Sequence, residues 1–183
     1  MSSVVLSGDT SGTVTLSVPA VAGTNTVTIA AQTGTLNAAG PSFSAYLSSS
    51  QTISSNTQTK INSTFTKVQF DTEEFDTANC YDNSTNYRFT PNVAGYYQVS
   101  IGMLSVYSSQ TLAYVTLFKN GAEYKRLNSI PGNGNEVNGS ALVYLNGSTD
   151  YIEAYGLING SGTLQFYGGQ IFTYFQACFV RGA

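Results

Sequence analysis

The sequence contains no histidine and no tryptophan, and only 9% of its 183 residues are charged. Histidine is the commonest general base and imidazole ligand, so its absence excludes Ser-His-Asp and Cys-His catalysis and most zinc sites. The Lys and Arg residues form no basic run and the net charge is -3, which disfavours binding to nucleic acid. We therefore expect neither an enzyme nor a cofactor.

Cysteine is also scarce. Cys80 and Cys178 are the two cysteines, and they lie far apart without CxxC spacing. They therefore predict neither a metal knuckle nor a redox pair. Their simplest interpretation is two small buried side chains. Whether they form a disulfide stays open, because that depends on the cellular compartment.

Long apolar runs are missing as well. No stretch approaches the ~18–20 apolar residues of a membrane span. The first residues, "MSSVVLSGDTSG", have neither the positive start nor the apolar centre of a secretory signal. We expect a protein without membrane insertion that is made and left in a cytoplasm, or released by another route.

Aromatic residues, by contrast, are plentiful, with 13 Tyr and 10 Phe. Alternating apolar and polar residues, β-branched residues and Asn/Gly turns dominate the chain, which predicts an all-β protein. Asn-Gly supplies the positive φ angles of a type I′ turn, so hairpins are predicted at Asn120-Gly121 and near Asn146-Gly147. A third strand pair is predicted on either side of Gly168-Gly169.

Composition divides the chain into residues 1–41 and residues 42–183. The first part has no aromatic residue, and "GTVTLSVPAVAGTNTVTIAA" predicts two strands around a turn from Pro19 to Gly23. A hairpin with so little bulk does not fold alone. The second part has about eight to ten strand-like runs, as in a sandwich or jelly roll.

Two of these runs are apolar on both faces, whereas a sandwich strand normally has one polar face. The faces of 171–180 carry Phe172, Tyr174, Cys178 and Val180 against Ile171, Phe175, Ala177 and Phe179. The faces of 111–118 carry Leu112, Tyr114 and Phe118 against Ala113, Val115 and Leu117. The second face must contact something, which predicts an obligate oligomer. The alternative is a loop of the same chain.

A spaced set of residues then points to a family. These residues are Phe70, Asp76, Tyr81, Phe89, Gly95 and Tyr97. The set resembles the signature of C1q/tumour-necrosis-factor-like jelly rolls, and 41–49, 117–126 and 171–180 resemble the opening strand, the Lys-Asn-Gly hairpin and the closing strand. The resemblance implies a homotrimer whose protomers meet around a threefold axis. Our interface candidates are Tyr114, Phe172, Tyr174, Phe175 and Phe179.

Residues 1–41 resemble the short β-segments at the start of bacteriophage appendage proteins. This resemblance implies a virion protein, assembled in the host bacterial cytoplasm, whose residues 1–41 bind other virion proteins. The hypothesis is a non-enzymatic trimeric knob, in a tail fibre or tail-associated protein, that adheres to host-surface glycan. The Asn, Tyr and Ser of loops 129–140 and 158–169 suit such binding, although turns use the same residues.

Two alternatives remain. A capsid decoration or cement protein is favoured by the small size of the chain. A polysaccharide-cleaving tail enzyme is the weaker one, because it depends only on paired carboxylates. The sequence does not choose between head and tail, or name a host or receptor.

One acidic stretch, "FDTEEFDTANCYDN", offers a weak calcium site in Asp71, Glu73 and Asp76. Carboxylate and carbonyl oxygens are the ligands that Ca²⁺ prefers. The spacing does not follow that of an EF-hand, so a solvated loop is the simpler interpretation.

Overall fold

The computed structural model describes residues 3–7, 13–17, 40–53, 65–106, 109–132 and 136–183. In this part of the chain no helix is long and apolar enough to cross a membrane. The chain forms two units, Met1–Leu36 and Asn37–Ala183. In the first unit, β1 (Ser3–Ser7) pairs antiparallel with β2 (Thr13–Ser17). A strand was predicted at the position of β2, but its expected partner after Gly23 lies outside the described residues.

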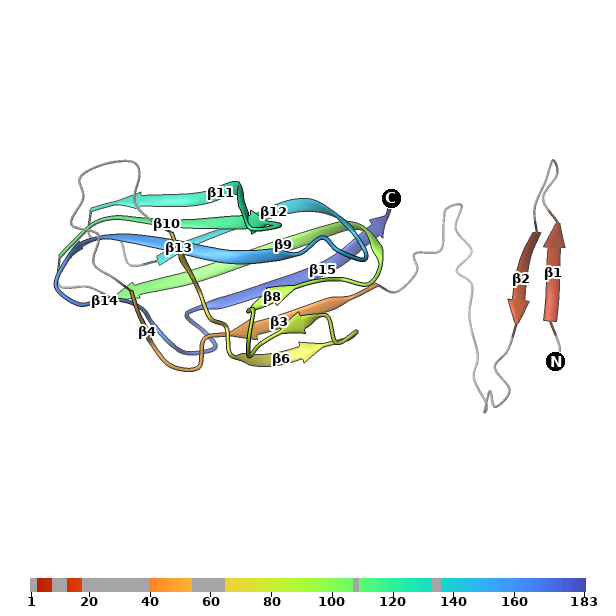
Figure 1. The fold of residues 1–183 in the computed structure, drawn as a ribbon, viewed down its shortest axis with the longest axis horizontal. Coiled ribbons are helices and arrows are strands. Elements are labelled where there is room, and N and C mark those ends of the chain that lie inside the picture. Colours follow the sequence, from red (N-terminus) through yellow and green to blue (C-terminus); the bar gives the residue numbers. More distant parts are fainter. Residues whose placement is uncertain (1–2, 8–12, 18–39, 54–64, 107–108, 133–135) are drawn as a thin grey trace. The chain divides into compact units, whose positions relative to one another are not determined.

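The second unit is a sandwich of two antiparallel sheets (Figure 1). The six-stranded sheet has the order β11-β10-β13-β8-β7, with β5 beside β13. Its strands are β5 (Thr66–Lys67), β7 (Tyr81–Asp82), β8 (Arg88–Phe89), β10 (Ser109–Lys119), β11 (Ala122–Pro131) and β13 (Ile152–Ser161).

The seven-stranded sheet has the order β4-β14-β9-β15-β3-β6. β12 pairs with β9 along the edge opposite to β15. The strands of this sheet are β3 (Ser42–Tyr46), β4 (Gln51–Ile53), β6 (Thr72–Asp76), β9 (Ala94–Val106), β12 (Glu136–Asn146), β14 (Leu164–Phe166) and β15 (Tyr174–Gly182). The predicted all-β jelly roll is confirmed.

Aromatic rings fill the space between the two sheets. The ring of Phe43 stacks on Tyr81 and Phe89, with centroids 4.5 and 4.6 Å apart, and meets the edge of Phe175 at 5.0 Å. The ring of Phe89 continues the cluster to Tyr97 at 5.6 Å. Each such buried ring contributes about 1.5–3 kcal/mol by leaving water. Four of the six signature residues, Phe70, Tyr81, Phe89 and Tyr97, therefore belong to the core.

The other two signature residues shape the backbone. Both carboxylate oxygens of Asp76 accept backbone N–H groups, from Ala78 at 3.1 Å and Tyr81 at 2.7 Å, which fixes the turn between β6 and β7. At Gly95 the next strand leaves no room for a side chain. A Cβ there would lie 2.4 Å from the carbonyl oxygen of Arg181.

The hairpin predicted at Asn120-Gly121 is confirmed. It joins β10 to β11, and both turn residues have positive φ angles, 53° and 78°. The predicted hairpin at Asn146-Gly147 is wrong, because β12 pairs with β9 and β13 with β10. The side-chain oxygen of Asn146 accepts the N–H groups of Ser148, Thr149 and Asp150, which winds a wider loop that crosses between the sheets.

The strand pair predicted around Gly168-Gly169 is also wrong. β14 and β15 lie in one sheet, but each pairs with β9 and not with the other. Alternation of side chains shows which face of a strand is buried, and it does not identify the neighbouring strand.

Candidate functional site

The outward face of the seven-stranded sheet carries small neutral and aromatic side chains in rows. Strand register aligns the residues of one row as Phe75, Ser44, Gln176, Ser100 and Ser140. It aligns those of the next row as Ser42, Cys178, Gln98 and Leu142. Tyr96 lies opposite Tyr144 beyond the second row, and Tyr174 opposite Gly102 before the first.

We call this surface the uncharged face. Among the described residues, the charged side chains of its own strands lie at the margins, namely Glu74, Glu136 and Arg181. Lys119 and Lys125 of the other sheet reach its β12 margin. Large side chains on it are open to solvent, with Phe75 51% and Leu142 48% exposed. Monomeric proteins seldom expose contiguous apolar patches. Aromatic residues with few charges are typical of the centre of a protein interface.

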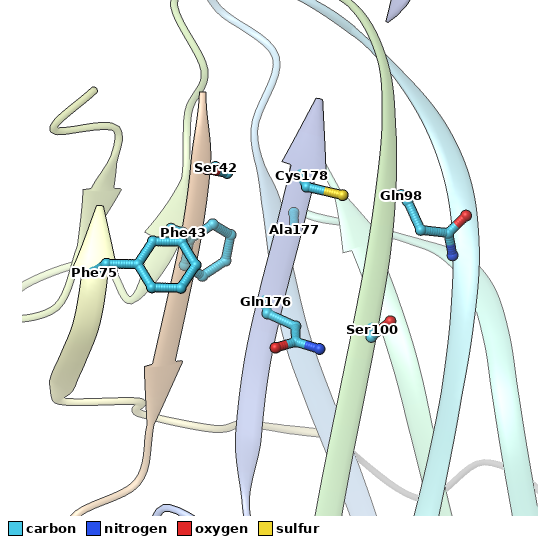
Figure 2. Close-up of a pocket in the computed structure, with 8 residues that line it drawn as sticks. All are labelled: Ser42, Phe43, Phe75, Gln98, Ser100, Gln176, Ala177 and Cys178. Atoms are coloured by element: carbon cyan, nitrogen blue, oxygen red, sulfur yellow. The ribbon is translucent and has the colours of Figure 1, made fainter. Parts of the chain in front are cut away.

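A groove of about 290 Å³ runs across this face. Figure 2 shows Gln176 and Cys178 on β15, between Phe75 on one side and Gln98 and Ser100 on the other. The lining residues are Ser42, Phe43, Phe75, Gln98, Ser100, Gln176, Ala177 and Cys178. We call this hollow the Cys178 groove. Its apolar atoms form most of the lining, and its polar groups are amides and hydroxyls without charge.

Of the residues expected at a trimer interface, Tyr174 lies on the uncharged face. A Cβ at Gly102 would lie 2.6 Å from its ring, so Gly102 is the residue that lets the tyrosine lie flat on β9. Phe172 lies just before β15 and is partly exposed, with its ring edge-on to Tyr167 at 5.1 Å. Both side chains are accessible to another chain.

Phe175 was also predicted at the trimer interface, and this prediction is wrong. It is 0% exposed, because alternation along β15 turns it inward, where its ring packs with Phe43 and Phe70. Phe179 faces the same way and contacts Tyr97 with ring centroids 5.5 Å apart. Since the protomer's own core uses Phe175, that side chain has no surface left for a threefold partner.

Tyr114 lies on the other sheet and is covered by its own chain. The ring of Phe65 meets it edge-on at 6.4 Å, and the guanidinium of Arg126 lies 5.3 Å from its centroid. Phe65 also contacts Phe118 on the same strand at 5.9 Å. The outward face of β10 is thus covered by residues of the same chain. This was the alternative to an oligomer for residues 111–118.

Sequence inspection missed Leu142 and Tyr144 on β12 and Phe75 on β6. The signal for the first two was present. Leu142 and Tyr144 alternate with the buried Val143 and Leu145, so β12 is apolar on both faces in the same way as 171–180. Phe75 gave no comparable signal, because it stands among the acidic residues of β6.

The acidic stretch does not gather into a metal site. The carboxylate of Asp71 accepts the N–H and hydroxyl of Ser48 at 2.8 and 2.6 Å, and Asp76 is occupied by backbone N–H groups. Burial, and after it the charge of Asp76, raises the pKa of Glu73. Within the described ranges no three His, Cys, Asp or Glu side chains are placed to hold a metal ion.

The two cysteines are free and lie in different surroundings. Cys80 is buried, and this burial raises the pKa of its thiol. Cys178 is exposed in the groove of the uncharged face. The reactivity of Cys80 therefore probes the core, and that of Cys178 probes the uncharged face.

The loops expected to bind ligand lie at one end of the sandwich. β11 ends and β12 begins there, and β13 ends and β14 begins there (Figure 1). Cys178 near the end of β15 pairs with Ser42 at the start of β3, so the C-terminus and the entry at Gly40 share the opposite end. Of loop 129–140, residues 133–135 lie outside the described residues.

Beside these loops, residues 167–172 form a fixed apolar tip. Ile171 is 79% exposed, and Tyr167 and Phe172 are exposed beside it. The backbone of the tip is held by hydrogen bonds from Gly169 N–H to the Leu47 carbonyl at 2.6 Å and from Phe172 N–H to the Gly169 carbonyl at 3.0 Å. The predicted binding loop 158–169 covers only the start of this segment, and Ile171 and Phe172, which were predicted to lie in the closing strand, precede β15.

Solved structures with a similar fold are tumour-necrosis-factor proteins. Eiger TNF from S. frugiperda has a TM-score of 0.54 at 8% identity, over 80% of this chain and 96% of that one. Murine APRIL has a TM-score of 0.53 at 9% identity, over 77% of this chain and 99% of that one. No family model matches the chain, and no curated protein does. The likeness shows a shared TNF-like jelly-roll fold.

Proposed function

We propose that this chain is a non-enzymatic structural protein of a bacteriophage particle, and that three copies associate through the uncharged face. The observation that carries the proposal is the composition of that face. It combines exposed Phe75, Leu142 and Tyr144 with a groove lined by neutral side chains. Burying such a surface is favourable in proportion to its apolar area and leaves no charge without a partner.

The trimer is tested by adding one charge to the face. Gln176 is exposed in the protomer and lines the groove, so Gln176→Lys leaves the single chain folded and places a charge in the interface. An unpaired buried charge costs several kcal/mol. Native mass spectrometry is expected to show a trimer for the wild-type protein and a monomer for the variant.

The matched control is Ser129→Lys, an exposed position on β11 of the other sheet. This variant adds the same charge and is expected to remain trimeric. A wild-type protein that is monomeric at micromolar concentration, or a Gln176→Lys variant that stays trimeric, contradicts the proposed interface.

The particle context is supported by residues 1–41, whose composition resembles the β-segments of phage appendage proteins. In our proposal this part binds the virion, and the loops at the end of the sandwich far from Gly40 contact glycan on the host surface. Three copies held in one orientation gain avidity without a new contact. The exposed, backbone-fixed tip at 167–172 supports the display of this end, because a preorganised surface loses little entropy on binding.

Antibody labelling of purified particles tests the location. The proposal expects label on the tail, and label on the head alone supports the alternative of a capsid decoration protein. Binding of the full chain to a glycan array, with Ile171→Ser as the comparison, tests adhesion. Release of reducing sugar from the bound polysaccharide is the result that overturns the non-enzymatic assignment.

A further inference from the structure

Two different patches must meet when copies of a chain form a closed ring. Rotation about the ring axis moves each atom around the axis and leaves its height along the axis unchanged. A protruding side chain on one protomer therefore fits a hollow on the next only if both lie at the same height. When the strands run along the axis, strand register measures this height.

Leu142 and the Cys178 groove satisfy this condition. Leu142 pairs with Gln98, and Gln98 pairs with Cys178, which in turn pairs with Ser42. Leu142 is on β12 at one margin of the uncharged face, and the groove extends to Phe75 on β6 at the other. A protrusion at one margin of the face and a hollow that extends from β9 to the other margin thus share one row.

The edge of β12 favours a contact through side chains. Lys125 donates to the carbonyl oxygen of Leu142 at 3.2 Å, and Lys119 donates to that of Tyr144 at 2.8 Å. Lysines that occupy an edge in this way prevent another strand from pairing with it. A neighbouring chain therefore contacts β12 through its outward side chains, of which Leu142 is the most exposed large apolar one.

The groove suits an aliphatic side chain. The backbone at Phe43 and Ala177, whose side chains are buried in the core, forms its floor. Phe75 forms one wall, and the polar groups around them are neutral. Its volume of about 290 Å³ has room for a leucine side chain, which displaces water from the part that it fills. Displacing water from apolar surface is favourable, and no charge opposes entry.

We infer that Leu142 of each protomer inserts into the Cys178 groove of the next, so that three identical contacts close the ring. This inference rests on the proposed trimer and specifies its contact. The occupant of the groove is a second copy of this chain.

The native thiol in the groove provides the test. In a Leu142→Cys variant the new thiol lies two strands from Cys178 of its own chain, about 10 Å away, since strands are about 4.8 Å apart. Disulfides require Cα atoms within about 7 Å, so only a thiol of another chain is within reach. Mild oxidation of the full-length variant is expected to give a covalently closed trimer on a non-reducing gel.

Two controls accompany this test. The double variant Leu142→Cys with Cys178→Ser is expected to give no covalent trimer. The wild-type protein is expected to stay uncrosslinked, and wild-type dimers linked through Cys178 overturn the inference, because they place the grooves against each other. If native mass spectrometry shows trimers but the Leu142→Cys variant forms no crosslink, the inferred contact is overturned and the proposed trimer is not. A protein without trimers defeats the proposed assembly itself.

A second measurement avoids oxidation. Leu142→Ala is expected to raise the concentration at which trimers dissociate by on the order of tenfold or more, and Leu142→Met, which conserves volume, by much less. Circular dichroism and urea unfolding of the monomeric fraction check that each variant folds. Equal dissociation of all three proteins contradicts the inference.

Discussion

The hydroxyl of Tyr97 donates a hydrogen bond to the backbone carbonyl of Val93 at 2.7 Å, while the tyrosine ring is fully buried. This one residue fixes the turn that leads into β9 and packs against the rings of Phe89 and Phe179. Its position in the family signature therefore reflects a structural role in the protomer.

Alkaline pH should destabilise the fold through two tyrosines. Burial raises the pKa of Tyr97 to about 12, from 10.0, and it also raises the pKa of Tyr81. A group with a raised pKa in the folded state contributes stability that is complete below the unfolded pKa and is lost as the pH rises above it. We expect the urea midpoint to fall between about pH 10 and pH 12.

The comparison is the double variant Tyr81→Phe with Tyr97→Phe. It removes the Tyr97 bond to Val93 and the bond from the Tyr81 hydroxyl to the Phe70 carbonyl at 3.1 Å. It should lose about 1 kcal/mol at neutral pH for each of these, and then decline much less in alkali. Parallel alkaline decline in the two proteins would assign the effect to other groups.

Gly95→Ala should destabilise the protein by about 1–3 kcal/mol, as overpacking does. The added Cβ meets the Arg181 carbonyl oxygen at 2.4 Å and the ring of Phe179 at 2.5 Å, and the backbone atom cannot move aside cheaply. The control is Gly182→Ala, the residue paired with Gly95 in β15, where nothing lies within 4 Å of a Cβ. Urea unfolding should separate the two variants, and equal midpoints contradict the prediction.

Asp82→Ala should cost about 1–2 kcal/mol, as the loss of a capping residue does. The carboxylate accepts the N–H groups of Ser84, Thr85 and Asn86 at 3.1, 2.9 and 3.1 Å. These hydrogen bonds hold the pKa of Asp82 well below its ordinary value, and the bond from Thr85 lowers it most. Asp82→Asn keeps an acceptor oxygen, so thermal unfolding should rank it between the wild type and the alanine variant.

Thiol labelling should report association of the uncharged face. Cys178 is exposed in the single chain and Cys80 is buried. We expect the assembled protein to react slowly at both, the Gln176→Lys monomer to react quickly at one, and the urea-unfolded chain to react at both. Equal fast labelling of the assembled protein and the variant shows that Cys178 lies outside the interface.

The sequence predicted the fold class because aromatic spacing is a property of the core. Phe70, Tyr81, Phe89 and Tyr97 stand at intervals set by strands that meet at one cluster of rings. The turn at Asn120-Gly121 was predictable for a local reason, since two consecutive positive φ angles restrict the choice of residues.

Pairing between strands was not predictable in the same way. Asn146-Gly147 looks like a hairpin turn, and the side chain of Asn146 decides otherwise by capping a wider loop. The sequence also did not decide which face of residues 171–180 points outward, because that depends on the neighbouring strands. Phe175 contacts Phe43 and Phe70, which precede it by more than a hundred residues, and Tyr174 lies over Gly102.

The position of β15 has a consequence for synthesis. β3 and β9 do not pair with each other, and β15 lies between them and bonds to both. β15 follows both of them in the chain, so the middle of the seven-stranded sheet stays open until β15 has been synthesised. A chain that stops before Tyr174 lacks the strand that joins the two halves of this sheet, and it exposes two unpaired edges of the kind that aggregate. The uncharged face is therefore complete only once β15 has paired with both neighbours.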